Sequence, residues 1–202
     1  MNKIDYNQQF LDLIATLDHK PTLLLHSCCA PCSSGVLEQV VPYFNVTLYY
    51  FNPNITDRDE YQMRLDELHR YVREAYNGTI PIINGEYKPE EFFKIAKGLE
   101  NIPEGGMRCT LCYSQRLAST AYLAKKNNFD YFTTTLSISP YKDAQRLNQI
   151  GGALARKHKV NYLFSDFSSS YPRSIELSKQ YNLYLQDYCG CIYSKAYGVP
   201  VE

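Results

Sequence analysis

The sequence predicts one α/β domain, a parallel five-stranded sheet covered by helices on both faces. Two observations carry this prediction. Short apolar or β-branched runs alternate with segments of helical periodicity along the chain, and 202 residues suffice for one well-packed domain but hardly for two. We therefore expect residues 1–202 to form a single domain, with residues 1–20 as an N-terminal helical extension.

The expected strands are short runs that end at turn-forming residues. Residues 46–51, for example, are β-branched and aromatic, and Asn52-Pro53-Asn54 follows them. The five strands are predicted at residues 22–26, 46–51, 79–83, 129–136 and 161–165.

Helical periodicity fills the segments between these strands. Thr56 and Asp59 resemble a capping box, and apolar residues follow at spacings of three and four as far as Ala75. Further helices are predicted at residues 33–41, 89–99, 112–126 and 172–181, and one after the turn at residues 137–142. Residues 1–20 carry a helical stripe rather than the apolar core of a signal peptide, and no run is long enough to span a bilayer.

All seven cysteines fall into three tight groups, whereas core cysteines would scatter along the chain. The groups are Cys28, Cys29 and Cys32; Cys109 and Cys112; Cys189 and Cys191. The first group follows a predicted strand, and Ser33 or Ser34 is expected to cap the next helix. Helix N-terminal amides favour thiolate over thiol, so this turn is a candidate for metal or redox chemistry. In the reducing cytoplasm, where we expect the protein, cysteines favour these roles over disulfides, which would form only if a metal were lost.

The thiols should meet at one edge of the sheet. Ligands of parallel sheets bind outside the carboxyl ends of the strands. The first cysteine turn, residues 52–54 and residues 137–142 all follow strands at that edge. Seven thiols exceed the four ligands of a structural zinc, whereas a cubane iron–sulfur cluster would use four and leave three for a neighbouring metal or thiol chemistry. The spacing favours iron–sulfur, and zinc remains the alternative.

The overall charge gives no support to non-specific nucleic-acid binding, because 21 basic residues balance 21 acidic ones. Any such contact needs a local patch, and residues 142–159 form the most basic window. A solvated helix face explains such a window more often than a phosphate footprint does.

Several motifs, taken as a set, resemble those of the cobalamin-independent epoxyqueuosine reductases. They are Cys28-Cys29-Ala30-Pro31-Cys32, Tyr50-Phe51-Asn52-Pro53-Asn54-Ile55, Glu60-Tyr61 with Arg64, Arg108-Cys109 with Cys112-Tyr113 and Arg116-Leu117, Phe132-Thr133-Thr134-Thr135-Leu136, Ser139-Pro140-Tyr141-Lys142 and Tyr188-Cys189-Gly190-Cys191. The resemblance runs from about Leu23 to the end, and residues 1–20 lie outside it.

This resemblance implies a fold related to the nucleotide-binding HUP superfamily, which is Rossmann-like. It also implies a 4Fe-4S cluster with an adjacent mononuclear iron, and reduction of epoxyqueuosine to queuosine at the wobble position of tRNA. The partners would be a tRNA carrying epoxyqueuosine in its anticodon loop and an external electron donor, since nothing resembles a flavin or nicotinamide site. We expect no membrane partner.

Site roles are expectations that follow from this resemblance. Cys109 and Cys112 would bind the cluster with one thiol of the first turn and one of the tail, and the other three, Cys32 among them, would surround the single iron. Proton donors would be Tyr113, Tyr141 and Lys142. The substrate would contact Asn52, Asn54, Tyr61 and Arg64, and the tRNA would contact Arg116, Lys142, Arg146, Arg156 and Lys157.

Two other functions remain open at this point. An ATP-dependent tRNA sulfur-transfer enzyme would share the sheet and the paired cysteines, but it needs a glycine-rich phosphate loop after the first strand, where this chain has Ser27 and the first cysteine group. A zinc-stabilised RNA-binding module would need a strongly basic surface, which the composition disfavours.

Overall fold

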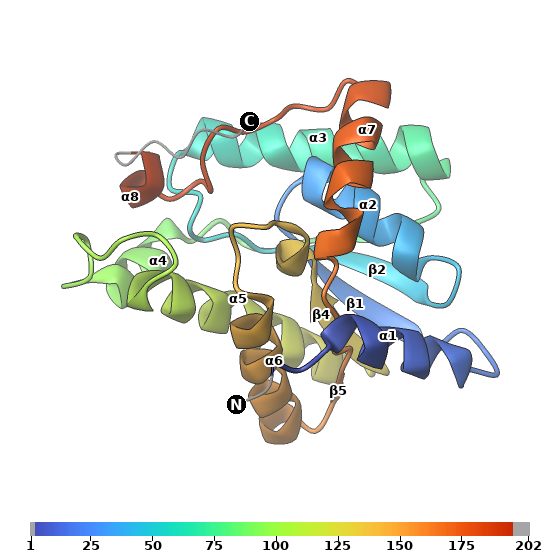
Figure 1. Cartoon of the computed structure of the whole chain (residues 1–202). Coiled ribbons are helices and arrows are strands. Elements are labelled where there is room, and N and C mark those ends of the chain that lie inside the picture. The colour runs from blue at the N-terminus through green and yellow to red at the C-terminus, as the bar shows by residue number, and fades with distance from the viewer. Residues whose placement is uncertain (1–2, 196–202) are drawn as a thin grey trace.

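The computed structural model describes residues 3–195 and contains a five-stranded, all-parallel sheet of order β3-β2-β1-β4-β5 (Figure 1). The predicted α/β fold is therefore confirmed, and it is consistent with a Rossmann-like arrangement. The strands are β1 (Thr22–Ser27), β2 (Asn45–Tyr50), β3 (Ile82–Asn84), β4 (Tyr131–Thr134) and β5 (Asn161–Tyr162).

Helices cover both faces of this sheet (Figure 1). One face carries α1 (Tyr6–Ala15), α2 (Ala30–Val40), α3 (Arg58–Tyr76) and α7 (Tyr171–Gln180). The other carries α5 (Met107–Lys126) and α6 (Ala144–His158), with α4 (Pro89–Ala96) packed on α5. Short helices complete the described part of the chain: η1 (Thr135–Ile138), η2 (Ser168–Ser170) and α8 (Ile192–Lys195).

The central strand β1 explains why the sheet is buried on both sides. Leu23 and Leu25 point into the core beneath α2 and α3, while Leu24 points into the core beneath α5 and α6. All three side chains are fully buried. Full burial of each leucine contributes roughly 1.5–3 kcal/mol. Because both faces of the strand are buried, its sequence is a run of apolar residues rather than an alternation of apolar and polar ones.

The chain order reverses beside β1, and this reversal places the site. The chain leaves β1 toward β2 on one side and later returns to β4 on the other. In open parallel sheets such a switch point opens a crevice outside the carboxyl ends of the strands. The segments after β1, β2 and β4 meet there, as the sequence predicts.

Two helices begin earlier than the sequence predicts, and each has a cysteine at its N-cap or in its first turn. α2 begins at Ala30, three residues before the predicted start, because the Cys29 thiol caps it by accepting from the Cys32 backbone N–H (3.3 Å). Ser33 and Ser34 instead bond back to carbonyls inside the first turn. α5 begins at Met107 rather than at residue 112, so its cysteines lie in the first two turns.

Other boundaries differ for local reasons. α3 is capped by Asp57 rather than Thr56, since the Asp57 carboxylate accepts from two backbone N–H groups. β4 stops at Thr134, whose hydroxyl accepts from Leu136 N and starts η1. β5 is confined to two residues.

The N-terminal helix packs against the rest of the fold. Phe10 of α1 is 2% exposed, and its ring meets Phe167 edge to face at 5.6 Å. Within residues 3–195, no helix combines the length and the apolar character that crossing a membrane requires.

Candidate metal centre

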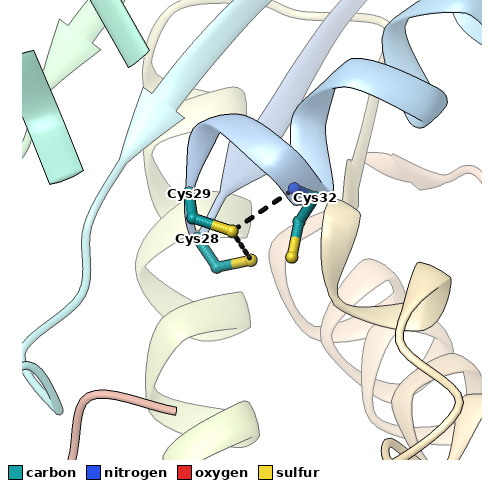
Figure 2. A group of neighbouring side chains, drawn as sticks. All are labelled: Cys28, Cys29 and Cys32. Atoms are coloured by element: carbon teal, nitrogen blue, oxygen red, sulfur yellow. Dashed lines mark hydrogen bonds between the residues drawn. The ribbon is translucent and has the colours of Figure 1, made fainter. Parts of the chain in front are cut away.

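Three thiols meet where β1 ends and α2 begins. The Cys28, Cys29 and Cys32 sulfurs lie within 4.8 Å of one another, and the Cys28 and Cys29 sulfurs are 3.7 Å apart (Figure 2). In a tetrahedral site with metal–sulfur bonds of about 2.3 Å, two ligand sulfurs lie roughly 3.8 Å apart. The three thiols therefore have the spacing of ligands to one metal ion.

The protons of this triad are shared unequally. Hydrogen bonds from Cys29 and Cys32 hold the pKa of Cys28 well below its ordinary value, whereas burial raises the pKa of Cys29 to about 12. The Cys28 sulfur also contacts Thr135 Oγ1 (3.4 Å), and Gln186 Nε2 donates to the Cys29 sulfur (3.1 Å). A bound cation would replace the thiol protons, as metal binding to cysteine requires.

The other four cysteines line one small cavity of about 330 Å³, including the part open to solvent. Cys109 and Cys112 are three residues apart on α5, so their side chains share one helix face. Gly105 N donates to the Cys109 sulfur (3.3 Å), and burial raises the pKa of Cys112 to about 11. Cys189 and Cys191 close the cavity from the C-terminal segment.

The Cys189-Gly190-Cys191 turn is fixed by the loop that follows β2. Asn54 Nδ2 donates to the Cys189 carbonyl (3.2 Å), and Thr56 N donates to the Gly190 carbonyl (3.3 Å). Gly190 has a φ of +101°, and a β-carbon there would lie 2.7 Å from Ile55 Cγ1. Only glycine suits this position.

A polar stripe on α3 holds the segment that leads to these two cysteines. Its members are spaced three or four residues apart, so they lie on one helix face. Glu67 accepts from Tyr184 N (2.7 Å), Arg70 donates to the carbonyls of residues 181 and 182, and Arg64 donates to the Tyr188 carbonyl (3.2 Å). The Tyr184 hydroxyl donates to the Glu60 carboxylate. The C-terminal segment is thus docked largely through its backbone.

Three cations surround the four-cysteine cavity. Arg108 and Arg116 are 1% and 3% exposed, and Lys142, which follows η1, is half-buried. Arg116 donates to Asn52 Oδ1 (2.6 Å), and its Nη1 lies 3.9 Å from the Cys112 sulfur. Its Nε lies 3.3 Å from His26 Nε2, and burial lowers the pKa of His26 to about 3, so that ring is neutral.

A second, wider cavity opens beside the first. It encloses about 810 Å³, including the part open to solvent, and it shares Glu104, Lys142 and Cys189 with the four-cysteine cavity. Cys32 lines it from the triad, and Tyr141, which is 54% exposed, lies at its rim. Tyr113 lines the inner cavity instead and is 5% exposed.

The four residues predicted to contact substrate are buried behind the cysteines. Asn52, Asn54, Tyr61 and Arg64 are at most 4% exposed, and each of them makes at least one hydrogen bond to another protein group, whereas Asn54 Oδ1 is buried without a partner among the described residues. The Tyr61 hydroxyl, for example, donates to the Gly85 carbonyl. Their burial argues for a role in positioning the cysteine loops rather than in direct contact with a macromolecule.

The five cations predicted to contact RNA do not lie together. Arg116 is interior, as described above. Arg146 donates to Thr110 Oγ1 (2.9 Å) and to the Gly105 carbonyl, so it joins the starts of α6 and α5. Arg156 and Lys157 occupy the last turn of α6, and Arg156 lies beside Asn161 at the amino end of β5, away from the cysteines.

Sequence reasoning missed Arg108, Glu104 and Gln186 as members of the site. A signal for Arg108 was present: Arg108, Cys112 and Arg116 are spaced by four residues, which places two arginines on the helix face of a cysteine. Glu104 and Gln186 lie in irregular segments, where no periodicity indicates a facing direction.

Fold and site together define an α/β protein whose cysteines are arranged to bind metal at the carboxyl edge of a parallel sheet. Sequence comparison identifies the family. The model of the family described as epoxyqueuosine reductase QueH matches residues 23–197. The chain therefore belongs to this family.

Individual relatives align with this chain over most of their length. A protein named epoxyqueuosine reductase QueH from Staphylococcus epidermidis is 39% identical over 202 aligned positions, which cover 95% of this chain and 85% of the relative. The protein of the same name from Streptococcus pyogenes is 38% identical, and the alignment covers 95% of this chain and 78% of the relative. The one from Thermotoga maritima is 32% identical, and the alignment covers 86% of this chain and 90% of the relative.

Proposed function

We propose that this chain is an epoxyqueuosine reductase, a cytoplasmic oxidoreductase that converts epoxyqueuosine to queuosine at the wobble position of tRNA. Family membership names the reaction. The observation that supports it most directly is the convergence of seven cysteines, from three distant segments, beside a cavity that opens to solvent.

The cysteines divide into two sets that suit two metal groups. The four that line the smaller cavity would hold a 4Fe-4S cluster, whose thiolates bind four different irons and so lie further apart than ligands of one ion. The closely spaced Cys28, Cys29 and Cys32 would hold a single iron. This division differs from the expected one, in which the first turn and the tail each gave one thiol to the cluster. The reason is that the first-turn thiols face one another.

The reaction needs two electrons and two protons. Both carbon–oxygen bonds of the epoxide break, a carbon–carbon double bond forms, and the oxygen leaves as water. The metal centre, when bound, supplies electrons from an external donor and a Lewis acid. The protein has to position the epoxide, deliver protons and exclude side reactions.

Of the three predicted proton donors, Lys142 is the one that lines both cavities, and so it would act on the departing oxygen. Its ammonium would donate a hydrogen bond or a proton there. Tyr113 lies on the inner side and would orient Lys142, while the exposed Tyr141 offers an aromatic ring on which a splayed anticodon base can stack.

The tRNA stem would follow α6 away from the cavity. The 15 residues of α6 span about 22 Å, and Arg146, Arg156 and Lys157 lie along it. This path would use the predicted cations other than Arg116. Replacing Arg156 and Lys157 together by glutamine should weaken tRNA binding at least threefold and flatten its salt dependence. Lys179→Gln on α7 is the matched control. Equal affinity and slope in all three proteins would place the RNA elsewhere.

Metal and product analysis tests the proposal as a whole. We expect anaerobically prepared protein to contain more iron than acid-labile sulfide, and with a chemical reductant to convert epoxyqueuosine in tRNA to a nucleoside lighter by one oxygen. Cys109→Ser should lose the sulfide, whereas Cys32→Ser should keep it and lose turnover. Stoichiometric zinc without sulfide would instead support the zinc-stabilised RNA-binding module.

A further inference from the structure

We propose that Arg116 and Arg108 are electrostatic partners of the metal centre in the four-cysteine cavity and raise its reduction potential. The inference rests on the proposed function, since it takes that centre to be the cluster. It adds a role for two side chains that touch no substrate-accessible surface.

Burial without an ion-pair partner is the first observation. Arg108 and Arg116 are almost completely buried, yet within residues 3–195 neither is among the side chains that form a salt bridge. A buried guanidinium needs a compensating negative charge. The Arg116 side chain donates to a neutral amide, a neutral imidazole and the Cys112 sulfur, and to no carboxylate of the described residues.

Incomplete hydrogen bonding is the second observation. Arg108 Nη1 donates to the carbonyls of residues 99, 100 and 102, which anchors the loop after α4. The face of the guanidinium lies over the Tyr193 ring, with its central carbon 5.0 Å from the ring centroid, but its Nε and Nη2 are buried without a hydrogen-bond partner among the described residues. Buried unsatisfied donors are rare in folded proteins, so their presence beside a cavity indicates a ligand with acceptor or anionic character.

The charge balance of the cavity points to the same ligand. Arg108, Arg116 and Lys142 contribute three positive charges, and Glu104 contributes one carboxyl group. Four thiolates carry four negative charges, of which the net positive charge of the iron–sulfide core neutralises only part. A cluster bound by these thiolates is therefore an anion surrounded by cations.

The sign of the effect follows from electrostatics. Reduction adds a negative charge to the centre, and nearby cations stabilise the reduced state more than the oxidised state. Net charge and hydrogen bonds to the sulfurs are known determinants of cluster potentials. Removing one buried cation should therefore make the cluster harder to reduce.

Redox titration of the loaded protein tests this without reference to activity. Arg116→Gln removes the charge and can keep the bond to Asn52, and Arg116→Lys keeps the charge with altered geometry. We expect Arg116→Gln to lower the equilibrium constant for one-electron reduction about tenfold, which corresponds to 59 mV, and Arg116→Lys to stay near wild type. Lys126→Gln, an exposed cation on the same helix, is the matched control.

Each outcome is decisive. Equal shifts in Arg116→Gln and Arg116→Lys, or none in either, would overturn the inference. If Arg116→Gln does not fold, Arg108→Gln against Arg108→Lys decides it by the same pattern. Loss of the cluster from the glutamine variants with retention in the lysine variants would support the charge requirement, and loss from both would refute it. Wild-type protein that binds no iron and sulfide would overturn the proposed function itself, which is a distinct result.

Discussion

Glu67→Gln should release the segment that carries Cys189 and Cys191. The Glu67 carboxylate accepts from Tyr184 N at 2.7 Å and from Arg70 at 2.7 and 2.8 Å, and Arg70 in turn donates to the carbonyls of residues 181 and 182. The substitution keeps the shape of the side chain but removes its negative charge and replaces one of its two acceptor oxygens with an NH2 group, which cannot accept a hydrogen bond from Arg70 or Tyr184. We expect the segment to open more often while the sheet stays intact.

The magnitude can be worked from these contacts. A hydrogen bond to a charged group contributes about 1.5–3 kcal/mol and a neutral one about 0.5–1.5, so each of two partners loses roughly 1 kcal/mol. Glu67 and Arg70 are 14% and 29% exposed, so solvent screens the pair only partly. A loss of about 2 kcal/mol raises the open population roughly thirtyfold, because about 1.4 kcal/mol is a factor of ten.

Hydrogen exchange followed by mass spectrometry measures this opening directly. Peptides that contain residues 183–195 should exchange roughly thirtyfold faster in Glu67→Gln, whereas peptides from β1 should not change. Glu74→Gln is the control, because Glu74 also pairs with Arg70 but is 41% exposed, and among the described residues its side chain makes no hydrogen bond to the segment. Equal acceleration in both variants, or none in Glu67→Gln, would refute the reasoning.

The pH dependence of this difference in hydrogen exchange tests the same ion pair. The Arg70 guanidinium holds the pKa of Glu67 below its ordinary value of 4.5. A group whose pKa is lowered in the folded state contributes stability above its unfolded pKa and loses it as the pH falls through the folded pKa. The difference between wild type and Glu67→Gln should therefore be constant near neutral pH and shrink below about pH 4.5.

Two pairs of glycine substitutions give further predictions. Gly190 has a φ of +101°, and a β-carbon there would lie 2.7 Å from Ile55, so Gly190→Ala should lower the metal content of the protein. Gly98 has a φ of +78° but no neighbour within 4 Å, so Gly98→Ala should lower stability alone. Equal metal loss in both variants would contradict this reasoning. Gly151→Ala would place a β-carbon 2.3 Å from the buried Tyr162 ring and should lower the free energy of unfolding by about 1–3 kcal/mol in urea titration. Gly152→Ala, at 3.0 Å from the half-buried Phe164 ring, should cost less, and the reverse order would refute the packing argument.

The sequence predicts the order and type of the main elements because apolar runs and turn residues punctuate the chain. The boundaries differ where side chains near the site act on the backbone. No propensity rule anticipates that the Cys29 thiol caps α2, or that Thr134 turns β4 into a 3₁₀ helix. The short helix α8 is also unforeseen, because its four residues carry no period.

The site, like the fold, can be predicted from the sequence only in part. The cysteines are predictable as a set because their grouping is visible along the chain, but their partition is not, since it depends on which sulfurs face each other in space. Arg116 illustrates the limit. A cation in a helical pattern is expected on the surface and suggests RNA, whereas packing places it against His26 and Asn52 in the interior.

The convergence of distant cysteines would also make a bound metal centre a cross-link. A centre that joins Cys112 to Cys189 closes a loop of 77 residues (189 − 112), comparable in topology to a disulfide between α5 and the C-terminal segment. Closing a loop of that length removes about 4 kcal/mol of conformational entropy from the unfolded chain. Part of the stability of the metal-loaded protein should therefore come from restriction of its unfolded state. This contribution cannot be seen in the contacts of the folded protein.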